Sequence, residues 1–302
     1  MGIEAPQALN TAAQARATWR DYVTLTKPRV ISLLLLTTLG AMLIAGDHIP
    51  PLSTIVLTLI GGYLAAGGAG ALNCYFDRDI DGVMSRTSRR PLPAHRIEPG
   101  QALIFGLVLS GLSFVILWLG ANLLAAALAM LGIVYYVGLY TNWLKRTSTQ
   151  NIVIGGGAGA IPPLVGWAAA TGTLSPAAFL LFAIIFYWTP PHFWALALVR
   201  RQDYARAGVP MLPVVYGEHL TRVQIVLYSV LMLILTLLLS ITGFMGAIYT
   251  AAALALGGLF LYYALRLLRS PSIPTTWRLY KYSLLYLALL FVAMVVDRAI
   301  LR

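Results

Sequence analysis

Charged residues are scarce in this sequence. Only 10% of its 302 residues are Asp, Glu, Lys or Arg, whereas a typical soluble domain contains about 25%. A soluble fold of this size could not cover its surface with so little charge. The hydrophobic share of 59% and the aromatic share of 11% also exclude a disordered chain, which would be polar and poor in aromatics. The remaining class is a polytopic helical membrane protein.

Cysteine and acidic residues are rare as well. Cys74 is the only cysteine, which excludes a disulfide framework and any metal or iron–sulfur site built from several cysteines. Ten acidic residues stand against 21 Lys and Arg, so the formal net charge is +11. An excess of positive charge indicates either a nucleic-acid partner or a membrane surface, and the positions of the charges distinguish the two.

Long uncharged runs separate the charged residues. A spanning helix needs about 20 apolar residues. Three runs exceed 40 residues and each is long enough for two helices, while three shorter runs hold one helix each. Period-two alternation is absent, which argues against a β-barrel. The sequence therefore predicts an all-α bundle of nine membrane spans, at 30–46, 52–75, 101–119, 122–142, 152–171, 176–198, 223–243, 246–266 and 280–297.

The basic residues lie in alternate connections. All Lys and Arg except Arg298 and Arg302 fall in the N-terminal arm or in the loops after the even-numbered spans. By the positive-inside rule that face is cytoplasmic, and an odd number of spans places the C-terminus outside. The first 29 residues lack the apolar core of a signal peptide. We therefore expect a cytoplasmic arm (1–29) and a single transmembrane domain (30–302) in a bacterial inner membrane.

Three of the ten acidic residues lie within five positions, in the segment ALNCYFDRDIDGVMSRTSRRPLP. Asn73, Asp77 and Asp81 recur every four residues, so a helix places them within an arc of about 80°, while Asp79 points away. Two carboxylates about 6 Å apart repel by roughly 3 kcal/mol at an effective dielectric of 20. A Mg²⁺ ion, which commonly shares its ligand shell with phosphate oxygens, would relieve this repulsion. The alternative is a solvated loop in which the aspartates pair with the arginines downstream.

A weaker copy of this pattern follows four spans later. Asp203 lies at the cytoplasmic end of the sixth span, and a Pro-x-x-Pro segment at 210–213 parallels the Pro-Leu-Pro at 91–93. An offset of four spans preserves orientation, so the pattern predicts a parallel internal repeat of about four helices, unlike the inverted repeats of many transporters. Two such clusters could hold the two sides of a diphosphate. The alternative is that Asp203 pairs with Arg200 or Arg201 in a loop.

These residues resemble the UbiA-type intramembrane prenyltransferase superfamily, which shares the Asn–Asp–Asp pattern, the later aspartate and the nine spans. Within it, the chain is similar to the protohaem IX farnesyltransferase (haem O synthase) family from about Thr24 to the ninth span. The segments that carry this similarity are LTKPRV at 25–30, YTNWLKRTSTQNIVIGGGAGAIPPLVGW at 140–167, WTPPHFWAL at 188–196 and DYARAGVPMLPVV at 203–215.

The resemblance implies a reaction. The farnesyl group of farnesyl diphosphate is joined to a vinyl group of haem B, with water added, to give haem O. It also implies Mg²⁺ as cofactor and haem A synthase or an oxidase assembly as partner. The lipid bilayer follows from the composition, and because the positive charge reports topology it indicates no nucleic-acid partner. By resemblance, Asn73, Asp77, Asp81 and Asp203 are the Mg²⁺–diphosphate ligands, the three aspartates being catalytic. Many superfamily members carry a further aspartate where this chain has Ala207, so the second metal shell is expected to be thinner.

Diphosphate leaves readily only when its growing negative charge is neutralised. The candidate cations are Arg86, Arg90, Lys145, Arg146, Lys27 and Arg29. For each of them the alternative is a basic residue that serves topology alone. An apolar cavity would shield an allylic cation from water.

His192 is the one histidine within a predicted span. The preceding Pro190-Pro191 predicts a break in the helix that exposes the ring to a cavity, where haem iron, a haem propionate or a catalytic water could meet it. The alternative is a hydrogen-bonded histidine that supports the kink. Asn151, beside Lys145 and Arg146, is a further candidate for substrate contact.

The glycine-rich runs do not indicate a nucleotide-binding loop, because they lie inside apolar spans and no strand precedes them. Close helix packing is the expected role. Two alternative functions remain: a superfamily relative that prenylates an aromatic acid or quinone precursor, and a transporter. A transporter would place its ionisable groups near the membrane midplane, whereas here they lie at helix ends.

Overall fold

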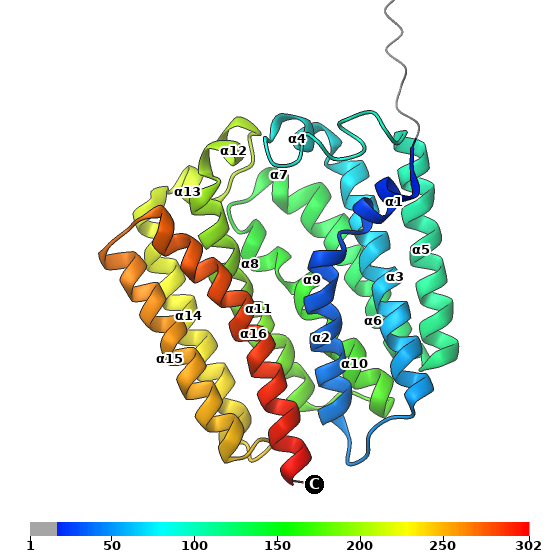
Figure 1. The fold of residues 1–302 in the computed structure, drawn as a ribbon, viewed down its shortest axis with the longest axis vertical. Coiled ribbons are helices and arrows are strands. Elements are labelled where there is room, and N and C mark those ends of the chain that lie inside the picture. The colour runs from blue at the N-terminus through cyan, green and yellow to red at the C-terminus, as the bar shows by residue number, and fades with distance from the viewer. Residues whose placement is uncertain (1–16, 302) are drawn as a thin grey trace, which may run out of the picture.

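The computed structural model describes residues 17–301, and all regular structure in this range is helical (Figure 1). The beginning of the predicted arm, including Arg16, and the terminal Arg302 lie outside the described residues. Nine helical segments in the described range are long and apolar enough to span a membrane, as predicted. They are Pro28–Ala45, Leu52–Phe76, Pro99–Gly120, Leu123–Thr147, Asn151–Thr171, Pro176–Val199, Gly217–Ile241, Ala247–Arg269 and Ile273–Ile300.

Seven of the nine spans in the described range are single helices. The long helices are α2 (Pro28–Ala45), α3 (Leu52–Phe76), α5 (Pro99–Gly120), α11 (Pro176–Val199), α14 (Gly217–Ile241), α15 (Ala247–Arg269) and α16 (Ile273–Leu301). The fourth and fifth spans are divided into α6 (Leu123–Val134), η1 (Tyr135–Leu144), α7 (Lys145–Thr147), α8 (Asn151–Gly155), α9 (Gly157–Ala160) and α10 (Pro162–Thr171). The connections add α1 (Trp19–Thr26), α4 (Arg78–Val83), α12 (Arg201–Arg206) and α13 (Leu212–Val215).

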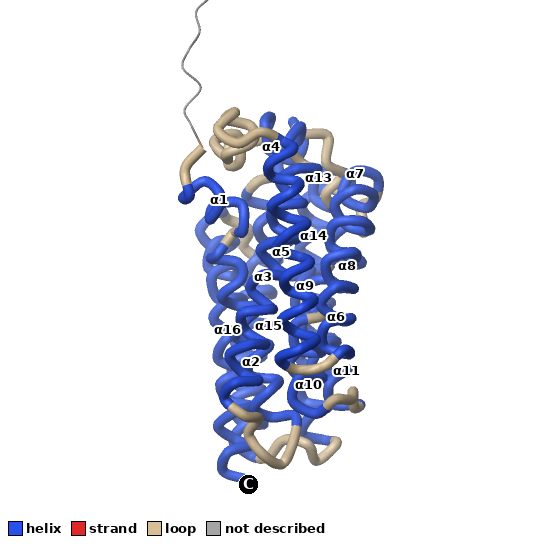
Figure 2. Tube along the Cα trace, turned by 90° about the vertical axis from the view of Figure 1, so that its right-hand side faces the viewer, coloured by secondary structure: helices blue, strands red, loops and turns tan. Residues whose placement is uncertain are grey.

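The short connecting helices gather at one end of the bundle. Helices α1, α4, α7, α12 and α13 lie there, and the C-terminal end of α16 lies at the opposite end (Figure 1). The view turned by 90° shows the same separation (Figure 2). This end carries the basic connections of the sequence, so it is called the basic end below.

Two helices begin well before the predicted spans. Helix α14 begins at Gly217 and α16 at Ile273, whereas the predicted spans begin at residues 223 and 280. The prediction used charged residues as boundaries, and these mark the apolar part of a helix rather than its first turn. Charged side chains such as Arg222 therefore occupy helical turns at the basic end. The parallel internal repeat of about four helices stays a prediction.

Glycines allow two segments to approach closely near the basic end. A Cβ atom on Gly70 of α3 would lie 3.0 Å from the carbonyl oxygen of Leu25, so the end of α1 packs directly on the backbone of α3. A Cβ atom on Gly155 would lie 2.2 Å from the ring of Tyr140 in η1. The glycine runs thus serve close helix packing, as expected. At the α1–α2 junction Lys27 adopts a left-handed backbone conformation with φ 59°.

A buried carboxylate lies near the opposite end. Asp297 of α16 is 2% exposed, and it accepts hydrogen bonds from the backbone N–H groups of Gly246 (2.5 Å) and Tyr249 (3.0 Å). These groups begin α15, where a negative charge also interacts favourably with the helix dipole. No residue pattern singles out Asp297, because its partners are main-chain atoms.

Candidate functional site

Asn73, Asp77 and Asp81 lie at the basic end, where α3 gives way to α4. Backbone hydrogen bonds from Asp77 N to Asn73 O (2.9 Å) and from Asp81 N to Asp77 O (2.7 Å) maintain the four-residue spacing across this junction. The three residues are 4%, 1% and 2% exposed. The side chain of Asp79, in contrast, is 60% exposed. The helical spacing therefore places the first three together and turns Asp79 away, as predicted.

Three cationic side chains from three separate segments meet this cluster. Lys27 Nζ donates to Asn73 Oδ1 at 2.5 Å. Lys145 Nζ donates to Asp77 Oδ2 at 2.5 Å, and Arg90 Nη1 donates to Asp81 Oδ2 at 2.6 Å. These cations come from the α1–α2 junction, the end of the fourth span and the loop after α4. Each was a predicted diphosphate-binding candidate. The alternative of aspartate–arginine pairs in a solvated loop holds for Arg90 only in its pairing, because Asp81 is buried rather than solvated.

The unusual backbone of Lys27 directs it into the cluster. A left-handed conformation is uncommon for a residue with a side chain and costs roughly 1–2 kcal/mol. Such strain is found where the surrounding structure requires one orientation, often at functional sites. Here the orientation brings the ammonium group to Asn73 and within 6.0 Å of the centre of the Tyr136 ring.

Thr141 orients the amide of Asn73. Asn73 Nδ2 donates to Asp77 Oδ2 (2.7 Å) and to Thr141 Oγ1 (2.9 Å), so the amide oxygen must face Lys27. The Thr141 hydroxyl donates in turn to the carbonyl of Tyr136 (2.9 Å). Thr141 belongs to the π-helix η1, an element that occurs frequently at functional sites. Sequence reasoning missed Thr141, although its position four residues before Lys145 was an available signal.

One oxygen of Asp77 has no hydrogen-bond partner. Asp77 Oδ1 is buried, and Arg146 Nη2 lies 3.9 Å from it, beyond hydrogen-bond distance. A buried carboxylate oxygen without a donor is costly, but it is the form a metal ligand takes before the metal binds. Within residues 17–301 no three His, Cys, Asp or Glu side chains cluster as a metal site. Two carboxylates and an amide nevertheless fit Mg²⁺, which usually completes its shell with water and phosphate oxygens.

Arg146 is held on the outer side of this oxygen. Its guanidinium makes a bidentate pair with Asp79 at 2.7 and 2.8 Å and donates to the carbonyl of Phe76 at 2.8 Å. The hydrogen bonds from Arg146 lower the pKa of Asp79 to about 2. The pair is therefore fully ionised at neutral pH.

Asp203 lies at the beginning of α12 and is 5% exposed. Both of its oxygens accept from the Ser85 hydroxyl (3.0 and 2.9 Å), and it forms an ion pair with Arg206. The alternative of pairing with Arg200 or Arg201 is therefore wrong, because the next turn of α12 supplies the cation instead. Burial raises the pKa of Asp203, but the bonds from Ser85 and Arg206 outweigh it and the pKa lies below its ordinary value.

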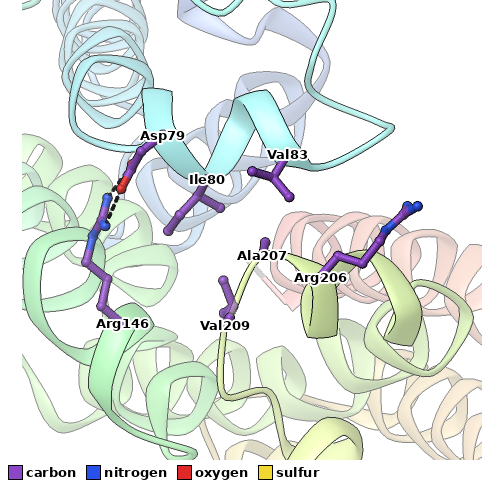
Figure 3. Close-up of a pocket in the computed structure, with 8 residues that line it drawn as sticks. Asp79, Ile80, Val83, Arg146, Arg206, Ala207 and Val209 are labelled. Carbon is purple, nitrogen blue, oxygen red and sulfur yellow. Dashed lines mark hydrogen bonds and ion pairs between the residues drawn. The ribbon is translucent and has the colours of Figure 1, made fainter.

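The contact between Ser85 and Asp203 joins the two loops that carry the aspartates. A pocket of about 350 Å³ opens between these loops (Figure 3). Arg146 and Arg206 lie at its two ends, and Asp79 is drawn paired with Arg146. Its lining residues are Asp79, Ile80, Val83, Arg146, Arg206, Ala207, Gly208 and Val209. Ala207, where the family resemblance implies that an aspartate is common, thus lines this pocket.

Two predicted cations lie apart from the cluster. Arg29 and Arg86 are exposed, and neither forms an ion pair within the described part of the chain. Lys27, Arg90 and Lys145 differ from them in contacting the buried oxygens directly.

His192 lies within an unbroken α11. The predicted break at Pro190-Pro191 does not occur, because the helix continues through both prolines despite the two missing N–H donors. The ring is stacked between Trp188 (centroids 4.5 Å apart) and Tyr280 (4.8 Å), which leaves the residue 7% exposed. His192 is therefore packed among aromatic rings rather than opened by a kink.

The hydrogen bonds of His192 define its tautomer. The Ser283 hydroxyl donates to the carbonyl of Tyr280 at 2.7 Å. It must then accept from His192 Nδ1, which lies 2.6 Å away. In the neutral ring Nδ1 carries the proton, and Nε2 keeps its lone pair.

Asn151 is fully buried at the start of α8. Its Nδ2 donates to the carbonyl of Pro210 at a long 3.4 Å, and its Oδ1 has no partner in residues 17–301. No hydrogen bond in this range links His192 or Asn151 to the aspartate cluster.

Comparison with known proteins agrees with this architecture. Residues 34–292 match the UbiA prenyltransferase family. A protoheme IX farnesyltransferase of Roseiflexus sp. (strain RS-1) is 60% identical over 281 residues, covering 93% of this chain and 53% of the relative. The chain thus spans about half the length of the first relatives it matches. A protoheme IX farnesyltransferase of Gloeobacter violaceus is 55% identical and covers 96% of both chains.

The fold is also found among solved structures. A UbiA homologue from Archaeoglobus fulgidus, bound to GPP and Mg²⁺, superposes with a TM-score of 0.67 at 17% identity, covering 91% of this chain and 99% of that one. At this identity the similarity establishes the fold alone.

Proposed function

The chain belongs to the UbiA prenyltransferase family, and we propose that it joins the farnesyl group of farnesyl diphosphate to a vinyl group of haem B. Water adds to the same vinyl group, so the products are haem O and diphosphate. The relatives named protoheme IX farnesyltransferase, at 60% and 55% identity, support this acceptor and donor. The observation that carries the proposal is the buried Asp77–Asp81 pair surrounded by Lys27, Arg90 and Lys145.

Asn73, Asp77 and Asp81 would hold Mg²⁺, with Asp203 on the opposite loop as a further ligand. The unpartnered Oδ1 of Asp77 and the all-oxygen donor set fit this ion. The solved homologue with GPP and Mg²⁺ supports a metal in this fold. When bound, Mg²⁺ supplies Lewis-acid stabilisation of the departing diphosphate.

The protein's own cations complete the neutralisation. Lys27, Arg90 and Lys145 each contact one oxygen of the cluster, and flexible side chains of this kind can turn from a carboxylate to a phosphate oxygen. Charge-assisted hydrogen bonds of this type are stronger than neutral ones. They would stabilise the charge that develops as the C–O bond of farnesyl diphosphate breaks.

Two aromatic side chains of η1 lie next to this cluster. Tyr136 and Tyr140 of η1 are stacked with centroids 5.6 Å apart, and Tyr136 lies beside Lys27. Aromatic faces stabilise cations, and apolar surroundings exclude water from a reactive allylic cation. We assign these two rings to the farnesyl side of the site.

His192 and Asn151 are proposed to contact the haem half of the reaction. His192 presents a lone pair at Nε2 because its Nδ1 carries the proton and donates it in a hydrogen bond to the Ser283 hydroxyl oxygen, and two flanking rings hold the imidazole in place. Asn151 presents an unpartnered buried oxygen. Both groups can therefore accept a hydrogen bond or meet an electrophilic centre of the substrate.

The distribution of basic residues also indicates how the chain is oriented in the membrane. The basic end is proposed to face the cytoplasm of a bacterial inner membrane, with the C-terminus outside, because the connections at that end carry most of the basic residues. This orientation would place the diphosphate site at the cytoplasmic surface. A haem A synthase or an oxidase assembly as partner remains a prediction from family resemblance.

The decisive experiment incubates purified protein with haem B, farnesyl diphosphate and Mg²⁺, followed by mass analysis of the haem. We expect a product heavier by one farnesyl group and one hydroxyl group, since the second proton of the added water leaves with the diphosphate, and no product when Mg²⁺ is chelated. An aromatic acid acceptor in place of haem serves as the control. A prenylated aromatic acid together with unchanged haem would refute the proposed acceptor while leaving the diphosphate chemistry intact.

A further inference from the structure

The guanidinium of Arg146 lies between two aspartates of very different exposure. It contacts Asp79 through two hydrogen bonds at 2.7 and 2.8 Å, while its Nη2 remains 3.9 Å from Asp77 Oδ1. The Asp79 side chain is 60% exposed, whereas that of Asp77 is 1% exposed. Figure 3 shows the bidentate pair at one end of the pocket between the loops.

Electrostatics alone would favour the buried aspartate. The attraction between two charges grows as water is excluded, so Asp77 attracts a second cation even though its Oδ2 already contacts Lys145 Nζ at 2.5 Å. Asp77 Oδ1 also lacks any hydrogen-bond partner, and a movement of Arg146 Nη2 of about 1 Å would provide one at ordinary hydrogen-bond distance. Arg146 instead keeps the fork-shaped contact with Asp79, whose planar carboxylate matches the guanidinium.

Helix geometry explains how Asp79 can do this. Asp79 is two residues from both Asp77 and Asp81, so it projects from the opposite side of the α4 turn. A third contact, from Arg146 Nη2 to the carbonyl of Phe76 at 2.8 Å, fixes the plane of the guanidinium. The guanidinium is therefore held by the Asp79 carboxylate and by the Phe76 carbonyl at the same time.

We propose that Asp79 is a positioning residue that holds Arg146 away from Asp77 Oδ1 and thereby keeps this oxygen free for the divalent cation of the metal–diphosphate complex. The inference rests on the proposed function, because it assumes that Asp77 is a metal ligand. The competing explanation is that the Asp79–Arg146 pair only fastens α4 to the end of the fourth span.

The test measures metal affinity directly. Mn²⁺ is titrated into detergent-solubilised full-length protein in the presence of inorganic diphosphate, and bound Mn²⁺ is read by electron paramagnetic resonance. In D79N the arginine loses its charged partner and should turn to Asp77, lowering Mn²⁺ affinity by roughly 10- to 100-fold, as is typical when a residue that orients a metal ligand is changed. D79E keeps the carboxylate and should restore most of the affinity.

The double variant D79N/R146A separates the two explanations. If Arg146 competes with the metal, the double variant should bind Mn²⁺ more tightly than D79N does, by most of the roughly 10- to 100-fold that D79N loses. If the pair only fastens the loop, the double variant should bind Mn²⁺ no better than D79N. E218Q is the matched control, because Glu218 is another exposed carboxylate at the basic end that holds an arginine, Arg201 at 3.3 Å. Its Mn²⁺ affinity should equal that of the unmodified protein.

Wild-type affinity in D79N, or a loss that R146A does not relieve, would overturn the inference. Absence of Mn²⁺ binding in the unmodified protein would overturn both the inference and the proposed metal site. Tight Mn²⁺ binding with the expected D79N effect, but no prenylated haem, would support the inference and reject the proposed acceptor. The failures of the two proposals are thus distinguishable.

Discussion

Buried carboxylates occur at both ends of the bundle, but they are stabilised by different kinds of hydrogen-bond donor. Asp297 accepts two hydrogen bonds from backbone N–H groups at the start of α15. Asp77 and Asp81 instead contact the side chains of Lys145 and Arg90. Backbone donors are fixed by the helix, whereas lysine and arginine side chains can change partners.

This difference separates a structural carboxylate from one that can take part in chemistry. Asp297 has no oxygen left without a donor, and its partners cannot leave without unwinding a helix end. One oxygen of Asp77 has no hydrogen-bond partner, and its cationic partner, Lys145, is a flexible side chain that can exchange partners. Burial alone therefore does not identify a functional acid, since all three residues are 1–2% exposed. The identity of the neutralising group is the more informative property.

The largest expected effect comes from the carboxylates at the basic end, Asp77 and Asp81. D77A and D81A should each abolish haem farnesylation while the protein still inserts into the membrane, because the metal-bound diphosphate is lost. A loss of at least roughly 10²–10³-fold is expected when a group that stabilises developing charge is removed. Haem product is measured by mass spectrometry and insertion by membrane fractionation. D77N, which keeps the side-chain shape, should be similarly inactive; retained transfer in D77A and D81A would remove the argument for a metal site.

Asp297, at the opposite end of the bundle, should affect stability rather than activity. D297A leaves the N–H groups of Gly246 and Tyr249 without their acceptor, so we expect the free energy of unfolding to fall by about 2–3 kcal/mol. Haem farnesylation per folded molecule should stay unchanged. Thermal unfolding in detergent and turnover by the remaining folded protein are the measurements. D297N, which keeps one acceptor oxygen, should lose less stability. A variant that stays stable but inactive would show that Asp297 also acts in the reaction.

Sequence reasoning succeeded where spacing encodes position. The four-residue interval of Asn73, Asp77 and Asp81 predicted a common face, and the structure shows it. Charge-free runs predicted nine spans because burial in a membrane excludes charge. The same runs misplaced the first turns of α14 and α16, because charged residues are tolerated in helical turns beyond the apolar part.

Contacts between distant segments were harder to predict. The pairing of Asp203 with Ser85 joins residues 118 positions apart, and Asp297 is neutralised by main-chain atoms that no residue pattern marks. The uninterrupted course of α11 through Pro190-Pro191 also contradicts the local rule, because packing on both sides of the helix outweighs two missing hydrogen bonds. Sequence patterns thus defined the aspartates of the site, while tertiary structure determined which cation each one meets.

A smaller effect is expected at His192, which lies outside both carboxylate groups. H192A should reduce kcat/KM for haem by about tenfold, equivalent to roughly 1.4 kcal/mol, because the positioned Nε2 lone pair is lost. The KM for farnesyl diphosphate should change little, since no hydrogen bond joins His192 to the aspartate cluster in the described part of the chain. Steady-state kinetics with each substrate varied in turn give both values. Unchanged haem kinetics and haem affinity would reject this assignment.

The smallest expected effect concerns the hydrogen bond by which Thr141 orients Asn73 at the basic end. T141V removes the hydroxyl that accepts from Asn73 Nδ2 and donates to the carbonyl of Tyr136. One hydrogen bond contributes about 1 kcal/mol, so kcat should fall about fivefold and the apparent affinity for Mg²⁺ should fall with it. T141S keeps the hydroxyl and should retain both values.

Thr147 provides the matched control for this prediction. Its hydroxyl also donates to a helix carbonyl, that of Trp143 at 2.9 Å, but it is exposed and contacts no residue of the cluster. T147V should therefore leave turnover and Mg²⁺ dependence unchanged. Equal effects of T141V and T147V would mean that η1 responds to a lost helix hydroxyl in general. A selective effect of T141V would show that the site of Asp77 and Asp81 also depends on the Thr141 hydroxyl. This hydroxyl would then keep Asn73 oriented while the surrounding cationic side chains change partners.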